Sequence, residues 1–356
     1  MPKSSYVHLA AFKDRRRESI PHEKKTGPFK SKSMRAAKEF AQILCQALKD
    51  EGLDIISENE DQQRLCKITT KTKLGYEFRV QLDACIPANQ SVRVGIEIKY
   101  MEAGIFFIPD TKKIAYDYLH LQKTHPRMVY IVVSGGRIAK SRKSEDKIRN
   151  MLVSFSDYFF DLDLEQEGSE RQYAKLVHLL RRLSKDSRKE NNLNKIPSRL
   201  VDTRYFGTPS GGDKKASHPE AIKLGNEFEA RVKKKLLEQN IPFSPMKGAV
   251  YTPNEVFSGR EKKTIELEGD IYIPSHNSPT YILECKNMQR LSRPFLSSLC
   301  FDAWHFKKKF KDVKYYAILG SKTKPFPTGF VDGYVDGLVY SDGLDSFIEY
   351  IGTQKL

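Results

Sequence analysis

The sequence predicts an α/β protein made of two tandem copies of one unit, each a mixed central sheet flanked by helices. Three observations support this prediction. One trio of charged residues occurs twice at the same spacing. Each trio lies on segments that alternate between apolar and polar residues, which is typical of half-buried strands. An amphipathic helix is predicted before each trio and an apolar strand after it, so the repeat extends to the scale of a domain.

The repeated trio consists of an Asp, a Glu and a Lys. Fourteen positions separate Asp from Glu in each copy, two separate Glu from Lys, and the copies lie 187 positions apart. Because side chains alternate along a strand, the Glu and the Lys are predicted to point the same way, and a paired strand would bring the Asp to them. The first trio is Asp83, Glu97 and Lys99, and the second is Asp270, Glu284 and Lys286.

The length of 356 residues is sufficient for two domains with separate cores. A hydrophobic fraction of 39% with 30% charged residues is typical of a globular protein rather than a disordered one. We expect a first domain over 34–183 and a second over 220–356. A basic flexible arm is expected over 1–33 and a basic linker over 184–219.

The first copy is predicted to follow the order α-β-β-β-α-β-α. Apolar residues spaced three and four apart indicate its helices, and alternation indicates its half-buried strands. A continuous apolar run indicates a strand that is buried on both faces. The predicted elements are a helix over 34–51, strands over 76–86, 92–99 and 106–108, a helix over 111–123, a strand over 128–133 and a helix over 170–183.

The second copy repeats this plan. Its two trio strands are joined by 274–279, a segment bounded by two prolines that predicts a hairpin turn. Three Asp-Gly pairs over 331–343 are interpreted as turns rather than metal ligands. The other predicted elements are a helix over 221–239, strands over 265–273 and 281–286, a helix over 295–310 and a strand over 314–319.

The five cysteines form no CxxC pair, which argues against a zinc ribbon or an iron-sulfur cluster. Cys285 lies between Glu284 and Lys286, and alternation predicts that it faces the core. No apolar run approaches membrane-spanning length, and the N-terminus has no secretory apolar region. The sequence therefore predicts a cytoplasmic protein that does not interact with membranes.

The net charge of +16 indicates a polyanionic partner. More than half of the excess lies in 1–33 and 184–219, where basic segments could contact phosphates without sequence preference. A solvated tail and linker is an equally simple interpretation. The lysines of 307–311 are open to the same two interpretations.

Two carboxylates beside a lysine suit Mg²⁺, which prefers oxygen ligands and keeps waters that a phosphate can replace. Such a metal activates a bound water, and the lysine can orient that water or offset charge on the phosphate. No histidine falls inside either trio. The pattern therefore predicts a hydrolytic site that acts on phosphate esters.

Gly269-Asp270 with Glu284-Cys-Lys286, preceded by a helical Glu, resembles the PD-(D/E)XK nuclease superfamily. The resemblance implies a restriction-endonuclease-like α-β-β-β-α-β fold and cleavage of phosphodiester bonds with Mg²⁺, or with Mn²⁺ as a substitute. Neither copy has Pro before the Asp, since Gly269 and Leu82 stand there, so the first copy departs further from the family pattern.

The resemblance also assigns roles to the residues of both copies. Asp270 and Glu284 become metal ligands and Lys286 the catalytic lysine, while Glu227 is the helical acid near the metal and Glu229 competes for that role. The counterparts in the first copy are Asp83, Glu97, Lys99 and Glu39.

Cutting both strands of a duplex requires two active sites, which a fused duplication could supply in one chain. The leading hypothesis is therefore an Mg²⁺-dependent DNA endonuclease acting as an intramolecular pseudo-dimer, in restriction, phage defence, recombination or repair. In a variant of it, only the second domain is catalytic. A non-catalytic nucleic-acid-binding protein on a decayed nuclease scaffold is the alternative from another class. RNA is a less favoured substrate because no aromatic platform is evident, and a homodimer remains open.

Overall fold

The structure is a computed structural model in which the chain forms two compact α/β units. The first unit consists mainly of residues up to Asn194, and the second mainly of residues from Lys195 onward. Each unit contains a mixed five-stranded sheet flanked by helices. The described residues are 6–12, 29–57, 66–72, 74–88, 91–100, 108–136, 148–149, 151–162, 168–185, 203–209, 218–244, 249–254, 263–288, 291–320 and 323–354.

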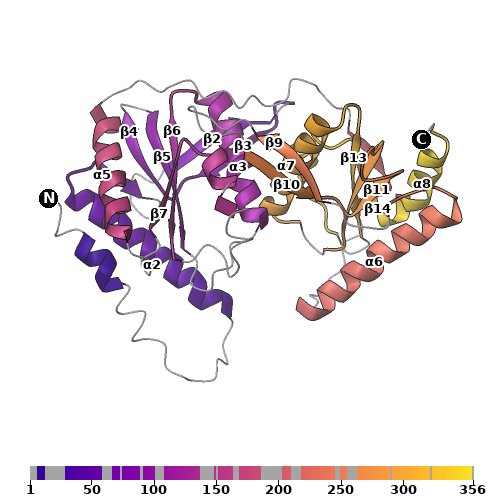
Figure 1. Ribbon diagram of the computed structural model, residues 1–356, viewed down its shortest axis with the longest axis horizontal. Coiled ribbons are helices and arrows are strands. Elements are labelled where there is room, and N and C mark those ends of the chain that lie inside the picture. The colour runs from indigo at the N-terminus through magenta and orange to yellow at the C-terminus, as the bar shows by residue number, and fades with distance from the viewer. Residues whose placement is uncertain are drawn as a thin grey trace. The chain divides into compact units, whose positions relative to one another are not determined.

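The first sheet has the strand order β1-β4-β5-β6-β7, and Figure 1 shows β4, β5 and β6 side by side within it. β1, β4 and β5 are antiparallel to one another in turn, whereas β5, β6 and β7 run parallel. β2 and β3 form a separate two-stranded sheet. The elements are α2 (Phe29–Asp50), β1 (Ile56–Ser57), β2 (Lys67–Lys71), β3 (Glu77–Gln81), β4 (Ala84–Ala88), β5 (Ser91–Tyr100), α3 (Ile108–Thr124), β6 (Val129–Gly135), β7 (Tyr158–Leu162) and α5 (Ser169–Lys185).

The helices of the first unit cover opposite faces of its sheet. Buried side chains of α2 and α5 form one core with Ile96 and Ile98 of β5 and with Ile131 of β6. Tyr118 of α3 packs against Tyr130, which alternation places on the other face of β6, 5.9 Å between ring centroids. Because Glu97 lies between Ile96 and Ile98, alternation directs it towards α3 rather than towards the core.

The single strand predicted over 76–86 is divided in the structure into β3 and β4, and Asp83 lies at the division. Its amide donates to the carbonyl of Ile96 at 3.1 Å, and its carboxylate accepts the amide of Ile98. The side chain therefore takes the place of a backbone acceptor where the strands part. The apolar alternation continues through Leu82 and Ala84, so the sequence pattern does not reveal the break.

The second sheet has the order β11-β12-β13-β14-β8, in which only β11 is antiparallel to its neighbour. The hairpin predicted between the two trio strands is confirmed as β11 and β12. β9 and β10 form a separate pair. The elements are β8 (Arg204–Phe206), α6 (His218–Glu238), β9 (Ala249–Asn254), β10 (Lys263–Glu268), β11 (Ile271–Ile273), β12 (Tyr281–Lys286), α7 (Arg293–Lys309), β13 (Lys314–Leu319), β14 (Gly337–Tyr340) and α8 (Leu344–Gly352).

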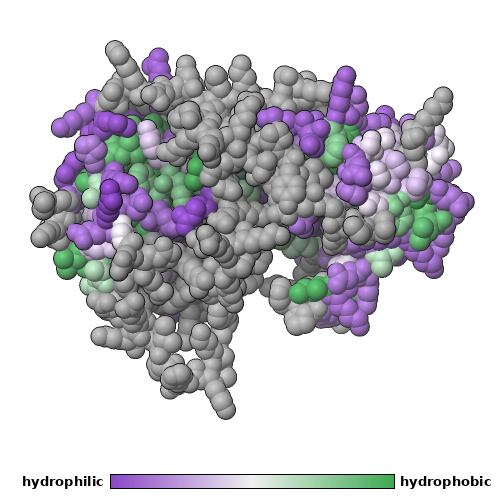
Figure 2. Space-filling model, in the orientation of Figure 1, coloured by the Kyte–Doolittle hydropathy of each residue, from purple (hydrophilic) through white to green (hydrophobic). Residues whose placement is uncertain are grey.

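The second unit has the same layering. Phe228, Val232 and Leu236 of α6 form a core with α8 and one face of the sheet, and Figure 2 shows mainly hydrophilic residues on the visible side of α6. On the other face, Phe306 of α7 stacks on Tyr315 of β13 at 5.9 Å. α3 and α7 both have 17 residues, and α7 begins and ends 185 positions after α3.

Parts of the expected arm and of the expected linker contribute to the folded units. Residues 6–12 are helical, and Leu9 and Phe12 are fully buried in the first core, so the expected arm of 1–33 is partly docked. The expected linker contains β8, whose Phe206 packs against the second core. A short group of apolar residues can bury its side chains in the core of a folded unit even when its sequence lacks the regular apolar spacing of a helix or strand.

Smaller differences concern the ends of elements. α2 begins at Phe29 rather than at 34. β7 was not predicted because its five residues include Asp161, and β14 was not predicted because its four apolar residues lie within 331–343, which the Asp-Gly pairs indicated as turns. The strand predicted over 106–108 is not seen at Ile108, which begins α3, and its other residues lie outside the described part. No helix among the described residues has the length and apolar character needed to cross a membrane.

Candidate active site

In the second unit, the structure brings the predicted trio together at one end of β12. Asp270 lies just before β11, and its Oδ2 accepts the backbone N–H of Cys285 at 2.7 Å. Lys286 and Glu284 share one face of β12, and the lysine Nζ donates to Glu284 Oε1 at 2.5 Å. Glu284 is only 7% exposed, so it is not the solvated edge residue that a charged strand usually carries.

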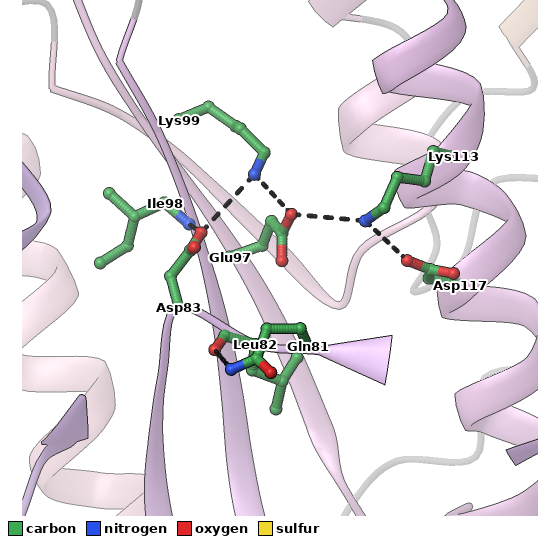
Figure 3. A network of polar contacts seen from close by, with 8 residues as sticks. All are labelled: Gln81, Leu82, Asp83, Glu97, Ile98, Lys99, Lys113 and Asp117. Atoms are coloured by element: carbon green, nitrogen blue, oxygen red, sulfur yellow. Dashed lines mark hydrogen bonds and ion pairs between the residues drawn. The ribbon is translucent and has the colours of Figure 1, made fainter. Parts of the chain in front are cut away.

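The first unit repeats the contact of the Asp with a backbone amide and that of the Lys with the Glu (Figure 3). Asp83 Oδ2 accepts the backbone N–H of Ile98 at 2.6 Å, and Ile98 follows Glu97 as Cys285 follows Glu284. Lys99 Nζ lies 2.6 Å from Glu97 Oε1 and 3.6 Å from Asp83 Oδ2. The two trios therefore have equivalent geometry as well as equivalent spacing.

In each trio, one carboxylate oxygen is buried and makes no hydrogen bond to the described residues. These atoms are Glu97 Oε2 and Glu284 Oε2. Leaving a buried carboxylate oxygen unsatisfied is costly, and such oxygens are the ligands that Mg²⁺ prefers. The residues present thus fit a magnesium ion held by an Asp and a Glu.

Within the described part of the chain, each trio contributes two carboxylates as candidate ligands. Within the described ranges, no group of three or more His, Cys, Asp or Glu side chains is placed to hold a metal ion. Mg²⁺ tolerates such a site because it retains several waters and accepts phosphate oxygens from a substrate.

Both trio lysines are held in the charged form. Burial lowers the pKa of Lys286, but the charges of Glu284 and Asp270 and the hydrogen bond to Glu284 outweigh this effect, and the pKa is raised. Lys99 behaves in the same way, with Asp83 and Glu97 as the opposing charges. A lysine with a raised pKa is a poor general base at neutral pH, but it can donate to a phosphate oxygen or to a water.

Cys285 packs against the core that contains α6 and α8, as alternation predicts. Burial, followed by the charges of Asp270 and Glu284, raises the pKa of its thiol well above the ordinary value. A thiol in this state does not act as a nucleophile, because the reactive form is the thiolate.

The helical acids occupy different environments. Glu39 of α2 is partly exposed. Glu227 of α6 is exposed, 3.9 Å from Lys223. Glu229 is much less exposed, lies 2.7 Å from Lys233, and carries one of the charges that raise the pKa of Cys285. Proximity to β12 therefore favours Glu229 over Glu227, while the metal-ligand role of Glu39 and Glu227 stays a prediction.

Sequence reasoning missed the helical residues that face the trios. Asp302 of α7 is buried, and its charge contributes to the raised pKa of Lys286. Asp117 of α3 is buried and lies 2.8 Å from Lys113, which in turn is 3.9 Å from Glu97. A signal was present, because Asp-x-x-His occurs in both helices, but its 185-position offset differs from the 187 of the trios.

The lysines of 307–311, at the C-terminal end of α7, lie at the other end of the sheet from the second trio. Parallel pairing sets Tyr281 beside Lys314 and Lys286 beside Leu319, so the end of α7 that leads into β13 is at the opposite end of the sheet. Lys307 is 2.7 Å from Asp336, a residue of the Asp-Gly pairs. These lysines therefore do not contact a phosphate bound at the trio.

A comparison of the chain with protein-family models finds no match, and a comparison with curated proteins finds none either.

Proposed function

We propose that this protein is an Mg²⁺-dependent DNA endonuclease that hydrolyses phosphodiester bonds with two restriction-endonuclease-like domains in one chain. The observation that supports it best is the recurrence of one contact pattern at both trios. In each, an Asp accepts the amide that follows the Glu, and a lysine donates to one Glu oxygen. The other Glu oxygen is left for a ligand.

A purely structural role explains this pattern less well. Burying a carboxylate costs free energy unless every oxygen is satisfied, and an apolar residue would pack at the same position without that cost. Glu97 is 2% exposed and Glu284 is 7% exposed, and both retain the same unsatisfied oxygen. Local violations of packing rules of this kind are typical of functional sites.

Each residue of a trio has a role in the proposed reaction. Asp83 with Glu97, and Asp270 with Glu284, would hold one Mg²⁺ in each unit. When bound, the metal lowers the pKa of a water and neutralises charge on the phosphate. Lys99 and Lys286 remain protonated, so they orient the attacking water or offset charge on the scissile phosphate. The Asp side chains also fix the backbone beside each Glu.

The substrate follows from charge and from the number of sites. A net charge of +16 favours a polyanion, and nucleic acid is the polyanion that contains phosphodiester bonds. Two equivalent sites in one chain match the two strands of a duplex. Double-stranded DNA therefore fits the protein better than a single-stranded substrate does.

Cleavage of supercoiled plasmid tests this function, with Mg²⁺ or with chelator, in the wild type and in Lys99→Ala and Lys286→Ala. Metal-dependent linearisation that becomes nicking in both variants is the expected result. Lys123→Ala and Lys309→Ala remove exposed lysines of α3 and α7 and serve as matched controls, and circular dichroism checks folding.

Other outcomes separate the alternatives. Loss of cleavage only in Lys286→Ala would assign catalysis to the second domain alone. Retained binding with no cleavage of plasmid, branched DNA or RNA would overturn the endonuclease proposal in favour of a non-catalytic nucleic-acid-binding protein.

A further inference from the structure

The two candidate sites differ at one helical position. In the first unit, Lys113 Nζ lies 3.9 Å from Glu97 Oε1 and 2.8 Å from Asp117 Oδ2 (Figure 3). In the second unit, the residue 185 positions later is Ser298, whose hydroxyl donates to Asp302 Oδ2 at 3.3 Å. A cation in one site thus corresponds to a neutral hydroxyl in the other.

The two helices can be aligned residue by residue. His120 Nδ1 lies 2.8 Å from the carbonyl of Tyr116, and His305 Nδ1 lies 2.9 Å from that of Phe301, which gives the same offset. The buried Asp117 and Asp302 also differ by 185 positions, and each interacts with the side chain four residues before it. Lys113 and Ser298 are therefore structurally equivalent.

The substitution changes the electrostatics of the Glu. Two ammonium groups, those of Lys99 and Lys113, lie within 4.0 Å of Glu97 Oε1. Among described residues, Glu284 has one such neighbour, Lys286. Glu97 is buried and Lys113 is partly buried, so solvent screens this interaction less than it screens a surface pair.

We propose that Lys113 sets the divalent-metal affinity of the first site by acting as a resident cation beside Glu97. A divalent ion bound by Glu97 is repelled by this ammonium, so the first site requires more metal than it would with a neutral residue. The inference rests on the proposed function, because it concerns the same metal site.

Asp110 also influences the first site. It lies in the first turn of α3, its charge acts on Lys99 and Lys113, and its equivalent in α7 is Phe295. Because this extra carboxylate attracts a metal while Lys113 repels it, a comparison of the two native sites does not isolate Lys113. A substitution at position 113 alone leaves Asp110 in place and therefore isolates the effect of Lys113.

The test is a reciprocal exchange in the full-length chain, Lys113→Ser and Ser298→Lys, with Mn²⁺ binding measured by isothermal titration calorimetry. Asp270→Asn silences the second site while the first is measured, and Asp83→Asn does the converse. We expect about tenfold tighter Mn²⁺ binding for Lys113→Ser and about tenfold weaker binding for Ser298→Lys. A change of this size is a small part of the Coulomb energy between an ammonium group and a divalent ion at this distance without solvent screening. Lys123→Ser removes the same charge from an exposed position of α3 and leaves the affinity unchanged.

The outcomes distinguish this inference from the proposed function. Mn²⁺ binding that is unaffected by both exchanges, or weakened by Lys113→Ser, overturns the role of Lys113 and leaves the metal site standing. Absence of Mn²⁺ binding at both sites in every variant overturns both. If Lys113→Ser does not fold, Lys113→Gln and the Ser298→Lys exchange still test the inference.

Discussion

Tyr272 of β11 fixes the turn before Asp270 through its hydroxyl, which accepts the backbone N–H of Gly269 at 2.6 Å. Burial, partly offset by this hydrogen bond, raises the pKa of Tyr272 to about 12. The charge of Glu284 acts in the same direction as burial. The phenol therefore stays neutral in the folded protein at pH values where an unfolded tyrosine ionises.

This shift predicts a loss of stability in alkali. The pKa of an unfolded tyrosine is about 10, so between pH of about 10 and about 12 the unfolded state loses a proton that folded Tyr272 keeps. The unfolded state then binds fewer protons, and the free energy of unfolding falls as pH rises. Urea denaturation of the wild type at several pH values in this window measures the fall.

Tyr272→Phe should make the fall with pH shallower. The variant also leaves the Gly269 amide without its acceptor, which costs about 1 kcal/mol at every pH, so the slope rather than the absolute stability is the relevant quantity. Equal slopes for variant and wild type would contradict the prediction.

The residues of the two trios could be predicted from the sequence because residue type and spacing alone define them. Lys113, Asp117 and Asp302 were missed: the Asp-x-x-His repeat marks two of them, but their approach to the trios depends on how each helix packs on its sheet. Which helical acid lies near the second site also depends on packing, because packing places Glu229 nearer to β12 than the more exposed Glu227.

Among elements, those with a clear period were predicted well and those held by neighbours were not. α3, α7, β6 and β13 have strong apolar patterns, and the structure contains each of them. β8 has only three residues and stands at the edge of its sheet beside β14, so tertiary contacts rather than local preference define it.

β8 offers a test of where the second unit begins. Phe206 packs against Phe347 at 5.2 Å between ring centroids and against Tyr350 at 5.6 Å. Because its side chain is only partly buried, Phe206→Ala should lower the free energy of unfolding of the second unit by roughly 1–3 kcal/mol, as measured by urea denaturation.

Tyr205→Ala is the matched control in the same strand, because Tyr205 is 46% exposed. It should cost less than Phe206→Ala. Similar stability of Phe206→Ala and wild type would indicate that β8 contributes little to the second unit.

For the whole molecule, the net charge of +16 predicts a strong dependence of DNA binding on salt. Each phosphate contact releases counterions, so the logarithm of the affinity falls linearly with the logarithm of salt concentration. We expect a loss on the order of tenfold or more between about 50 and about 200 mM salt, measured by fluorescence anisotropy of a labelled duplex in chelator. An affinity that does not change with salt would argue against phosphate contacts as its main source.

The change of offset from 187 positions at the trios to 185 at α3 and α7 has an evolutionary meaning. It corresponds to a difference of two residues in the length of the connection between the strand that carries the trio lysine and the helix that faces it, as expected if the two halves arose by duplication. Within the helices, the contacts of His120 and His305 with the carbonyls four residues earlier keep the 185-position offset. The connection beside the trio lysine therefore differs in length by two residues between the units, while the spacing from Asp to Lys within each trio is identical.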